Sequence, residues 1–320
     1  MKDWQTKIEE ITRVKELALQ QGGDEGVSKQ HDKGRLTIRE RISSLLDDNS
    51  FQEIGPTAGG GDRDKNGILT SFTPANFVLG FGKIDGRRCV VAGEDFTVKG
   101  GSPNAAGLRK SIYAEHLAIK YKVPLIRLHE GGGGSVGGTG NSSATVGTPV
   151  YETHRFKVVA EAMAAIPVVT TALGPVAGLP AARLVAAHLS IMSEENGQVL
   201  IAGPAVVERA LGEKKTKEEL GGSKVHTKNG VIDNPATSEE DAFRQVKTFL
   251  SYLPPNVWEL PPVIYTDDKP GRSDDALRSI VPTDRRKLYD MYKVVSTVLD
   301  ENSFFEIGPN YGRGQITGIA

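Results

Sequence analysis

The chain has 320 residues, of which 38% are hydrophobic and 37 are glycine, enough for a globular core of one large or two small domains. Its 39 Lys and Arg and 40 Asp and Glu leave a net charge of −1, which excludes a global basic field for nucleic acid or an anionic membrane. A single cysteine, Cys89, excludes a disulfide framework, and no apolar run reaches the ~18–20 residues of a membrane span. We therefore expect a cytoplasmic protein, with the mitochondrial matrix as the alternative although no presequence is visible.

The first hundred residues predict two helices and a hairpin. Apolar residues at three-residue steps indicate an amphipathic helix over 3–20, and a second helix is expected over 36–46 after a polar stretch. Further along, the apolar runs 77–84 and 89–91 flank the dipeptide Asp85-Gly86. An Asp-Gly pair between two such runs is a strong hairpin signal, because glycine tolerates a positive φ.

Strands and helices alternate after Asp95, which predicts an α/β fold with parallel strands. The first expected elements are a helix through Leu108, Ile112 and Ile119, a buried strand over 123–128, a glycine loop over 131–140 and a helix over 151–164. A strand over 167–173, a tight turn over 174–178 and an Ala-rich helix over 180–189 are expected next. Short strands at 190–192 and 199–202 and a helix that starts after Ser238 complete the pattern. Ser238 is the expected N-cap of that last helix, with Asp241 in the reciprocal position of a capping box.

An internal repeat indicates a second domain. Residues 46–56 reappear as 299–309, with nine of eleven positions identical at an offset of 253. Residues 316–320 are the expected counterpart of the strand at 78–82. We therefore predict one complete domain over 1–260, followed over 261–320 by a Pro-rich linker and the truncated start of a second copy.

Two glycine-rich turns each follow a predicted buried strand, at 131–134 and at 174–178. Backbone N–H groups at such turns and at a helix start have no intrahelical partner, so two facing turns can aim donors at one oxygen, as in an oxyanion hole. The same pattern also fits two tight connections without a ligand.

Other motifs in the glycine loop lack their structural context. Gly133-x-Ser135-x-Gly137 matches a hydrolase nucleophile elbow, and Gly132-x-Gly134-x-x-Gly137 matches a dinucleotide fingerprint, but no helix is predicted to follow either one. The histidines show no metal-ligand spacing, so no metal is expected. His129, beside the loop, is the one histidine that we single out as a candidate.

Six stretches of the chain carry a resemblance to a known family. They are Gln30-His31 with Gly34-Arg35-Leu36-Thr37 and Arg39-Glu40-Arg41-Ile42, Asp95-Phe96-Thr97-Val98-Lys99-Gly100-Gly101, Gly174-Pro175-Val176-Ala177-Gly178, Ala202-Gly203-Pro204, Glu219-Leu220-Gly221-Gly222 with His226, and Leu250-Ser251-Tyr252-Leu253-Pro254. Together and in this order they resemble the N-terminal half of the carboxyltransferase (beta) subunit of biotin-dependent acyl-CoA carboxylases, the propionyl-CoA and methylcrotonoyl-CoA type. The similarity runs nearly end to end.

The resemblance implies a crotonase-like fold, the ββα superhelix of the ClpP/crotonase class, present in two tandem domains. The first domain of the family holds the acyl-CoA, the second holds carboxybiotin, and the active site forms where two subunits meet. The implied partners are acyl-CoA, a biotin carboxylase or biotin carboxyl carrier subunit that brings the carboxybiotin, and further copies of the chain in a hexamer of dimers. Neither nucleic acid nor a membrane is implied.

The implied function is to bind acyl-CoA and to stabilise its enolate for carboxylation, while the decarboxylating biotin serves as the base. The residues that match the oxyanion hole are Gly178 and Leu179, together with Gly132 and Gly133. The expected CoA-binding residues are Lys99, Gly100, Gly101, Arg109, Lys110, Gly131, Gly134 and Ala177. Leu179 stands where the family usually has a second glycine, and its side chain is expected to narrow the acyl pocket. The loop 130–134 also departs from the family's Ser-Gly-Gly-Ala-Arg-like sequence.

Three alternatives stay open. A biotin-dependent decarboxylase subunit would run the same half-reaction backwards. A truncated, non-catalytic assembly fragment would bind a full-length homologue without turnover. A hydratase or isomerase would place an acid or base carboxylate in the site, for which Glu130 is the nearby candidate.

Overall fold

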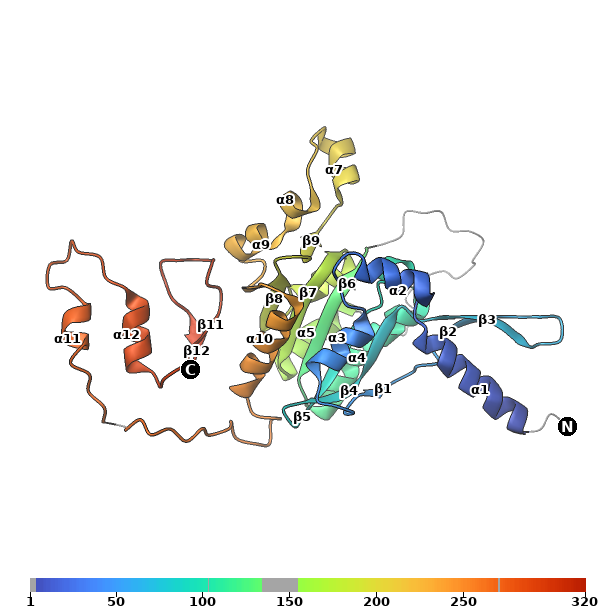
Figure 1. Ribbon diagram of the computed structural model, residues 1–320, viewed down its shortest axis with the longest axis horizontal. Helices are drawn as coiled ribbons and strands as arrows, with labels where there is room; N and C mark the ends of the chain where they lie inside the picture. The colour runs from blue at the N-terminus through green and yellow to red at the C-terminus, as the bar shows by residue number, and fades with distance from the viewer. Residues whose placement is uncertain (1–3, 103, 134–154, 270) are drawn as a thin grey trace.

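A computed structural model describes residues 4–102, 104–133, 155–269 and 271–320, and its centre is one mixed β-sheet (Figure 1). The eight-stranded sheet has the order β1-β4-β5-β6-β7-β8-β10, with β9 paired to the end of β7. Its strands are β1 Gln52–Glu53, β4 Phe77–Ile84, β5 Arg87–Glu94, β6 Leu125–Gly131, β7 Val168–Ala177, β8 Leu189–Ser193, β9 Gln198–Leu200 and β10 Asn234–Ala236. Strands β1, β4 and β5 pair antiparallel, and the pairs from β5 onward are parallel, as the alternation after Asp95 predicts.

The remaining elements surround this sheet or project from it. The helices are α1 Trp4–Leu19, α2 Gly23–His31, α3 Ile38–Leu45, α4 Ala105–Tyr121, α5 Arg155–Ala165, α6 Leu179–Leu184, α7 Pro204–Leu211, α8 Lys217–Gly221, α9 Ser223–Asn229, α10 Glu239–Ser251, α11 Leu277–Ile280 and α12 Met291–Val298, with a 3₁₀ turn at Lys99–Gly101. Two small hairpins pair β2 Gly59–Arg63 with β3 Leu69–Pro74 and β11 Phe305–Glu306 with β12 Gly318–Ile319. Figure 1 shows α7–α9 and the β2–β3 hairpin projecting away from the sheet.

The local signals predicted several elements correctly. Asp85 and Gly86 have φ values of 50° and 78°, which close the expected hairpin between β4 and β5. Ser238 caps α10 by accepting a hydrogen bond from the Asp241 N–H. The reciprocal part of this capping box was wrong, because the Asp241 carboxylate accepts from the N–H of Thr237 at 2.9 Å.

Other expectations need correction. The polar stretch before Arg35 contains α2, and the Ala-rich helix ends at Leu184 instead of residue 189. The expected tight turn at 174–178 is mostly strand, because β9 pairs with Pro175, Val176 and Ala177 and keeps β7 extended as far as Ala177. This pairing joins segments more than twenty residues apart, so no local pattern announces it.

The two faces of the sheet carry separate hydrophobic layers. Strand residues such as Val91, Ile126 and Leu128 pack with α3 and α10 on one face. Their neighbours, such as Val90 and Leu125, pack with α4 and α5 on the other face. Successive side chains of a strand point to opposite faces, so this division follows directly from the period of two. We call these the α3/α10 face and the α4/α5 face.

The sequence repeat is also a repeat of local structure. Helix α12 and strand β11 lie 253 residues after α3 and β1, the offset of the identical residues. Asn49 and its counterpart Asn302 both have a positive φ, 56° and 59°. The Phe305–Ile319 pair of β11–β12 matches the Gln52–Phe81 pair of β1–β4, so residues 316–320 form the expected counterpart of strand residues 78–82. The proposed domain division at residue 260 stays a prediction.

Candidate functional site

The two glycine bends that follow neighbouring strands lie against each other. Gly178 follows β7 with a φ of 66°, and Gly133 lies two residues after β6. A Cβ atom added to Gly178 would lie 2.9 Å from the Cα of Gly133, closer than real Cβ contacts. The two main chains therefore meet with no room for a side chain on Gly178. Their role as oxyanion donors stays a prediction.

The 3₁₀ turn at Lys99–Gly101 packs beside these bends. Gly132 donates its N–H to Gly100 O at 2.9 Å, and a Cβ on Gly101 would lie 2.9 Å from the Cα of Gly131. The structure thus brings Gly100, Gly101, Gly131 and Gly132 together, as a shared site requires. Because the Gly132 N–H is already bonded, Gly133 is the better donor candidate on this side. Gly134, like Ser135 and Gly137 of the rejected motifs, lies outside the described residues.

The basic residues expected to bind CoA phosphates divide into two groups. Lys99 and Arg109 are exposed, and they remain candidates for phosphate binding. Lys110 is buried, donates to Gly55 O at 3.2 Å, and lies 3.8 Å from Glu53. Burial lowers the pKa of Lys110 to about 8. An ammonium held by these groups is poorly placed for a CoA phosphate, so the structure argues against this role for Lys110.

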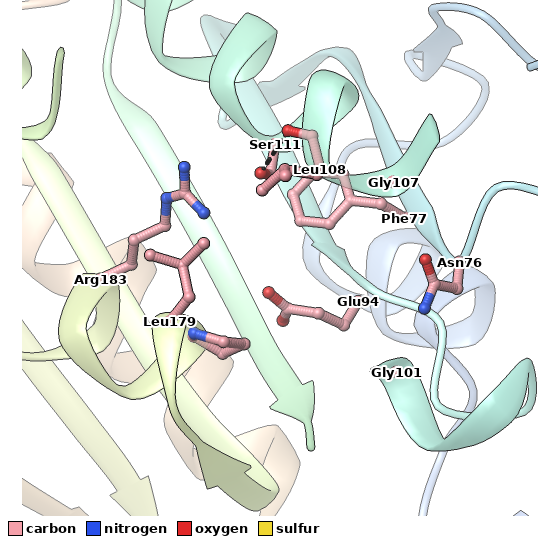
Figure 2. Close-up of a pocket in the computed structure, with 10 residues that line it drawn as sticks. Asn76, Phe77, Glu94, Gly101, Gly107, Leu108, Ser111, Leu179 and Arg183 are labelled. Carbon is pink, nitrogen blue, oxygen red and sulfur yellow. Dashed lines mark hydrogen bonds between the residues drawn. The ribbon is translucent and has the colours of Figure 1, made fainter. Parts of the chain in front are cut away.

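A small pocket of about 20 Å³ lies at the start of α6, which follows Gly178 in the chain (Figure 2). Its lining residues within the described chain are Asn76, Phe77, Glu94, Gly101, Gly107, Leu108, Ser111, Leu179, Pro180 and Arg183. Leu179 and Pro180, the first two residues of α6, form one wall, and Phe77 and Leu108 form another (Figure 2). A cavity of this volume holds about one water molecule, which needs ~10–15 Å³, and it is far smaller than small-molecule pockets of ~300–1,000 Å³. Ala177, one of the expected CoA-binding residues, is the last residue of β7 and lies two positions before Leu179 in the chain.

The sequence-based reasoning missed Glu94, whose carboxylate lies within this pocket (Figure 2). Both of its oxygens face Nδ1 of the buried His129, at 3.1 and 3.3 Å. Burial opposes ionisation of Glu94, but the charge and hydrogen bond of His129, aided by Arg183, hold its pKa below the ordinary value. His129, which the sequence singled out, therefore belongs to the site through Glu94.

Glu130, the candidate acid or base of the hydratase alternative, lies on the α3/α10 face. It is fully buried and accepts hydrogen bonds from Arg35 at 3.1 Å, Arg41 at 2.5 Å and Gln30 at 2.5 Å. Arg41 also binds Glu239 on α10, so the group joins α3 to α10. A carboxylate held by two guanidinium groups is a structural anchor, and the sequence-based choice of Glu130 for the site is wrong.

A second buried charge cluster supports the pocket from the α4/α5 face. Glu115 on α4 accepts from Arg127 at 2.6 Å and from Arg183 at 2.8 Å. Burial lowers the pKa of Arg127 to about 10. Within the described chain, Nη2 of Arg183 and Oε2 of Glu115 are buried without a hydrogen-bond partner. The cluster fixes α6, and with it Leu179, against the sheet.

Two general properties bear on the class of site. Across the ranges that the structure covers, no group of three or more His, Cys, Asp or Glu side chains is placed to hold a metal ion. The same ranges contain no helix long and apolar enough to span a bilayer.

Cys89 is buried in β5, and burial raises the pKa of its thiol to about 12.

Known proteins share this architecture. The family model described as the carboxyl transferase domain matches residues 29–320. The chain is 31% identical over 317 residues to the methylmalonyl-CoA decarboxylase subunit alpha of Veillonella parvula, covering 99% of this chain and 61% of that one. It is 33% identical over 315 residues to the propionyl-CoA carboxylase carboxyltransferase subunit of Haloferax mediterranei, covering 98% and 60%.

Solved structures give the same result. The transcarboxylase 12S hexamer with hydrolysed methylmalonyl-CoA bound superposes with a TM-score of 0.83 at 26% identity, covering 99% of this chain and 62% of that one. The α/β sheet described above is thus the crotonase-like fold of carboxyltransferase domains. The chain spans about 60% of the length of these curated relatives. With a family match over residues 29–320 and these shared features, the chain belongs to the carboxyl transferase domain family.

Proposed function

We propose that this chain is the acyl-CoA-binding part of a biotin-dependent carboxyltransferase and stabilises the enolate of its thioester substrate. The observation that carries the proposal is the contact between the Gly133 and Gly178 bends, where a side chain on Gly178 would not fit. Removing a proton next to a thioester carbonyl places negative charge on its oxygen, and fixed N–H donors stabilise that charge most where it develops. Gly133, Gly178 and Leu179 are the proposed donors.

The remaining groups bind and orient the substrate in this proposal. Leu179 and Pro180, which line the small pocket after the Gly178 bend, limit the space for the acyl group, and the exposed Lys99 and Arg109 attract the phosphates of CoA. The turn at Lys99–Gly101 supports the loop that carries Gly133. Carboxybiotin, delivered as the second substrate by a biotin carboxyl carrier partner, supplies the carboxyl group when bound.

One comparison favours a second direction of the same chemistry. The relative from Veillonella parvula is named a decarboxylase subunit, whereas the relative from Haloferax mediterranei is named a carboxylase subunit. Both directions require the same stabilised enolate, so the proposed site serves either one. A non-catalytic assembly role also remains as an alternative.

Assembly and location are proposed along with this function. The proposed assembly is a homo-oligomer, like the hexameric transcarboxylase 12S core. We propose a cytoplasmic location.

The proposed site is tested by calorimetric titration with propionyl-CoA. Gly178→Ala introduces a Cβ atom 2.9 Å from Gly133, so we expect the bends to separate and the affinity to fall at least tenfold, equal to ~1.4 kcal/mol. Gly212→Ala is the matched control, because Gly212 has a φ of 71° but no atom within 4 Å of an added Cβ. Equal affinity of the Gly178→Ala variant and the natural chain, with both folded, would refute the proposed site.

A further inference from the structure

The small pocket at the start of α6 is lined by polar side chains that are themselves buried. Asn76, Glu94 and Arg183 line it, and none of the three residues is more than 6% exposed. Figure 2 shows Arg183 with Leu179 on the α6 side of the pocket, and the Glu94 carboxylate facing them from β5. A negative and a positive group, both taken out of solvent, therefore border the same small space.

These two charged groups do not pair with each other. Among the ion pairs of the described residues, Glu94 pairs with His129 at 3.1 Å and Arg183 pairs with Glu115 at 2.8 Å. The Arg183 charge nevertheless helps to hold the pKa of Glu94 below its ordinary value, which places the guanidinium near the carboxylate. The two side chains are thus close to each other with space for a small ligand between them.

Two polar atoms of the lining side chains are left without a hydrogen bond among the described residues. They are Nη2 of Arg183 and Oδ1 of Asn76, and both atoms are buried. The Glu94 carboxylate accepts from His129 and has further lone pairs for a second donor. Buried polar groups in proteins are almost always hydrogen-bonded, to protein or to an ordered water. The lining therefore offers one unused donor and two acceptors to a ligand.

The volume and the charges of the pocket select the ligand. A cavity of about 20 Å³ holds one water molecule, which needs ~10–15 Å³, and it is too small for an organic ligand. An anion there would be repelled by the Glu94 carboxylate, and a cation would be repelled by the Arg183 guanidinium. Water is neutral and both donates and accepts hydrogen bonds, so it suits the two groups at the same time.

We propose that this pocket is a binding site for one water molecule, which accepts a hydrogen bond from Nη2 of Arg183 and donates one to the Glu94 carboxylate. Its second O–H donates to Oδ1 of Asn76, which gives the three hydrogen bonds typical of a buried water. The water attaches α6 to β5, whereas the ion pair of Arg183 with Glu115 attaches the same helix to α4. The proposal goes beyond the proposed function, because the water binds whether or not the chain binds acyl-CoA.

A high-resolution crystal structure of the natural chain, from crystals soaked in sodium bromide, tests the site. We expect one isolated density peak at ~2.6–3.2 Å from both Nη2 of Arg183 and a Glu94 oxygen, without the anomalous signal of bromine. A direct ion pair between the two side chains with no peak between them would overturn the proposal. A bromide ion at the site would overturn it as well.

Two substitutions of Glu94 test the site in solution, where ¹⁷O magnetic relaxation dispersion counts the long-lived internal waters. Glu94→Gln keeps two polar atoms at the end of the side chain, and either one bonds the water, so the count should equal that of the natural chain. Glu94→Leu removes both atoms and should lower the count by one. Glu240→Leu is the matched control, because it makes the same chemical change at an exposed position of α10 and should leave the count unchanged.

An unchanged count in a folded Glu94→Leu variant would refute the water site. Should this variant not fold, the density peak between Arg183 and Glu94 in the natural chain decides the question alone.

Discussion

Leu179 forms a wall of the pocket directly after the Gly178 bend, and its truncation tests whether this side chain limits the length of the acyl group. Leu179→Ala removes three carbon atoms from the wall and keeps the backbone N–H of residue 179. The freed space suits about three additional methylene groups on the substrate. Each buried methylene contributes ~0.8 kcal/mol, so hexanoyl-CoA should gain up to ~2.4 kcal/mol relative to propionyl-CoA, about 60-fold in affinity.

The assay is calorimetric titration of the natural chain and the variant with acyl-CoAs of two to eight carbons. We expect the natural chain to prefer short acyl groups, and Leu179→Ala to shift this preference toward about six carbons. Leu211→Ala, at the exposed end of α7, provides the same chemical change away from the pocket and should leave the preference unchanged. An unchanged ratio of hexanoyl-CoA to propionyl-CoA affinity in Leu179→Ala would refute the assignment of Leu179 to the acyl wall.

Two further predictions concern stability and the second repeat. Lys110→Met should stabilise the fold at pH 7 by up to about 3 kcal/mol, because the pKa of Lys110 falls from 10.5 to about 8 on folding. The gain in the free energy of unfolding should shrink as the pH rises from 8 to 10.5, because Lys110 of the folded chain loses its proton in this range. Urea unfolding of both chains at the two pH values tests this, and a gain that grows with pH would contradict it. Asn234→Ala removes two hydrogen bonds to β11 and its flank, with Glu306 O at 3.0 Å and Gly308 N at 2.9 Å. Each hydrogen bond contributes ~1 kcal/mol, so hydrogen exchange of the backbone amides across 305–310, measured by mass spectrometry, should become about 30-fold faster. Unchanged exchange would show that Asn234 does not hold β11 against the sheet.

The parts of the fold that the sequence predicts are those with local signals. The Asp85-Gly86 turn has the positive φ values that its residues favour, and the repeat predicts β11 because identical residues adopt the same local structure. Helix α2 escaped prediction because its sequence is polar with almost no apolar period. The extension of β7 escaped because it depends on pairing with β9. Contacts distant in sequence decide such boundaries, and composition does not report them.

The candidate site shows the same division. Each glycine bend follows one of two parallel neighbouring strands, so the strand pattern predicts that the two bends lie close together. That Gly178 is the residue which meets Gly133 depends on the extension of β7, which the sequence does not predict. The buried position of Lys110 does not follow from the strand pattern, because Glu53 and Gly55 come close to Lys110 only through the antiparallel pairing of β1 with β4. A basic residue near a helix start therefore gives no information on its partner until the sheet is assembled.

The choice between Glu94 and Glu130 depends on a single residue of register. On β5, Val90 and Ala92 face α4 and α5, so Glu94 two positions later points to the same face, toward the pocket. On β6, Leu128 belongs to the α3/α10 face, so Glu130 also points there, to Arg41, while His129 points the opposite way to Glu94. A one-residue shift of β6 would turn Glu130 toward the pocket, and a one-residue shift of β5 would turn Glu94 away from it. The alternation of side chains within each strand is thus the signal that could have identified Glu94 from the sequence. It assigns Glu94 and Glu130 to opposite faces of the sheet, whereas closeness to the glycine loop does not distinguish the two carboxylates.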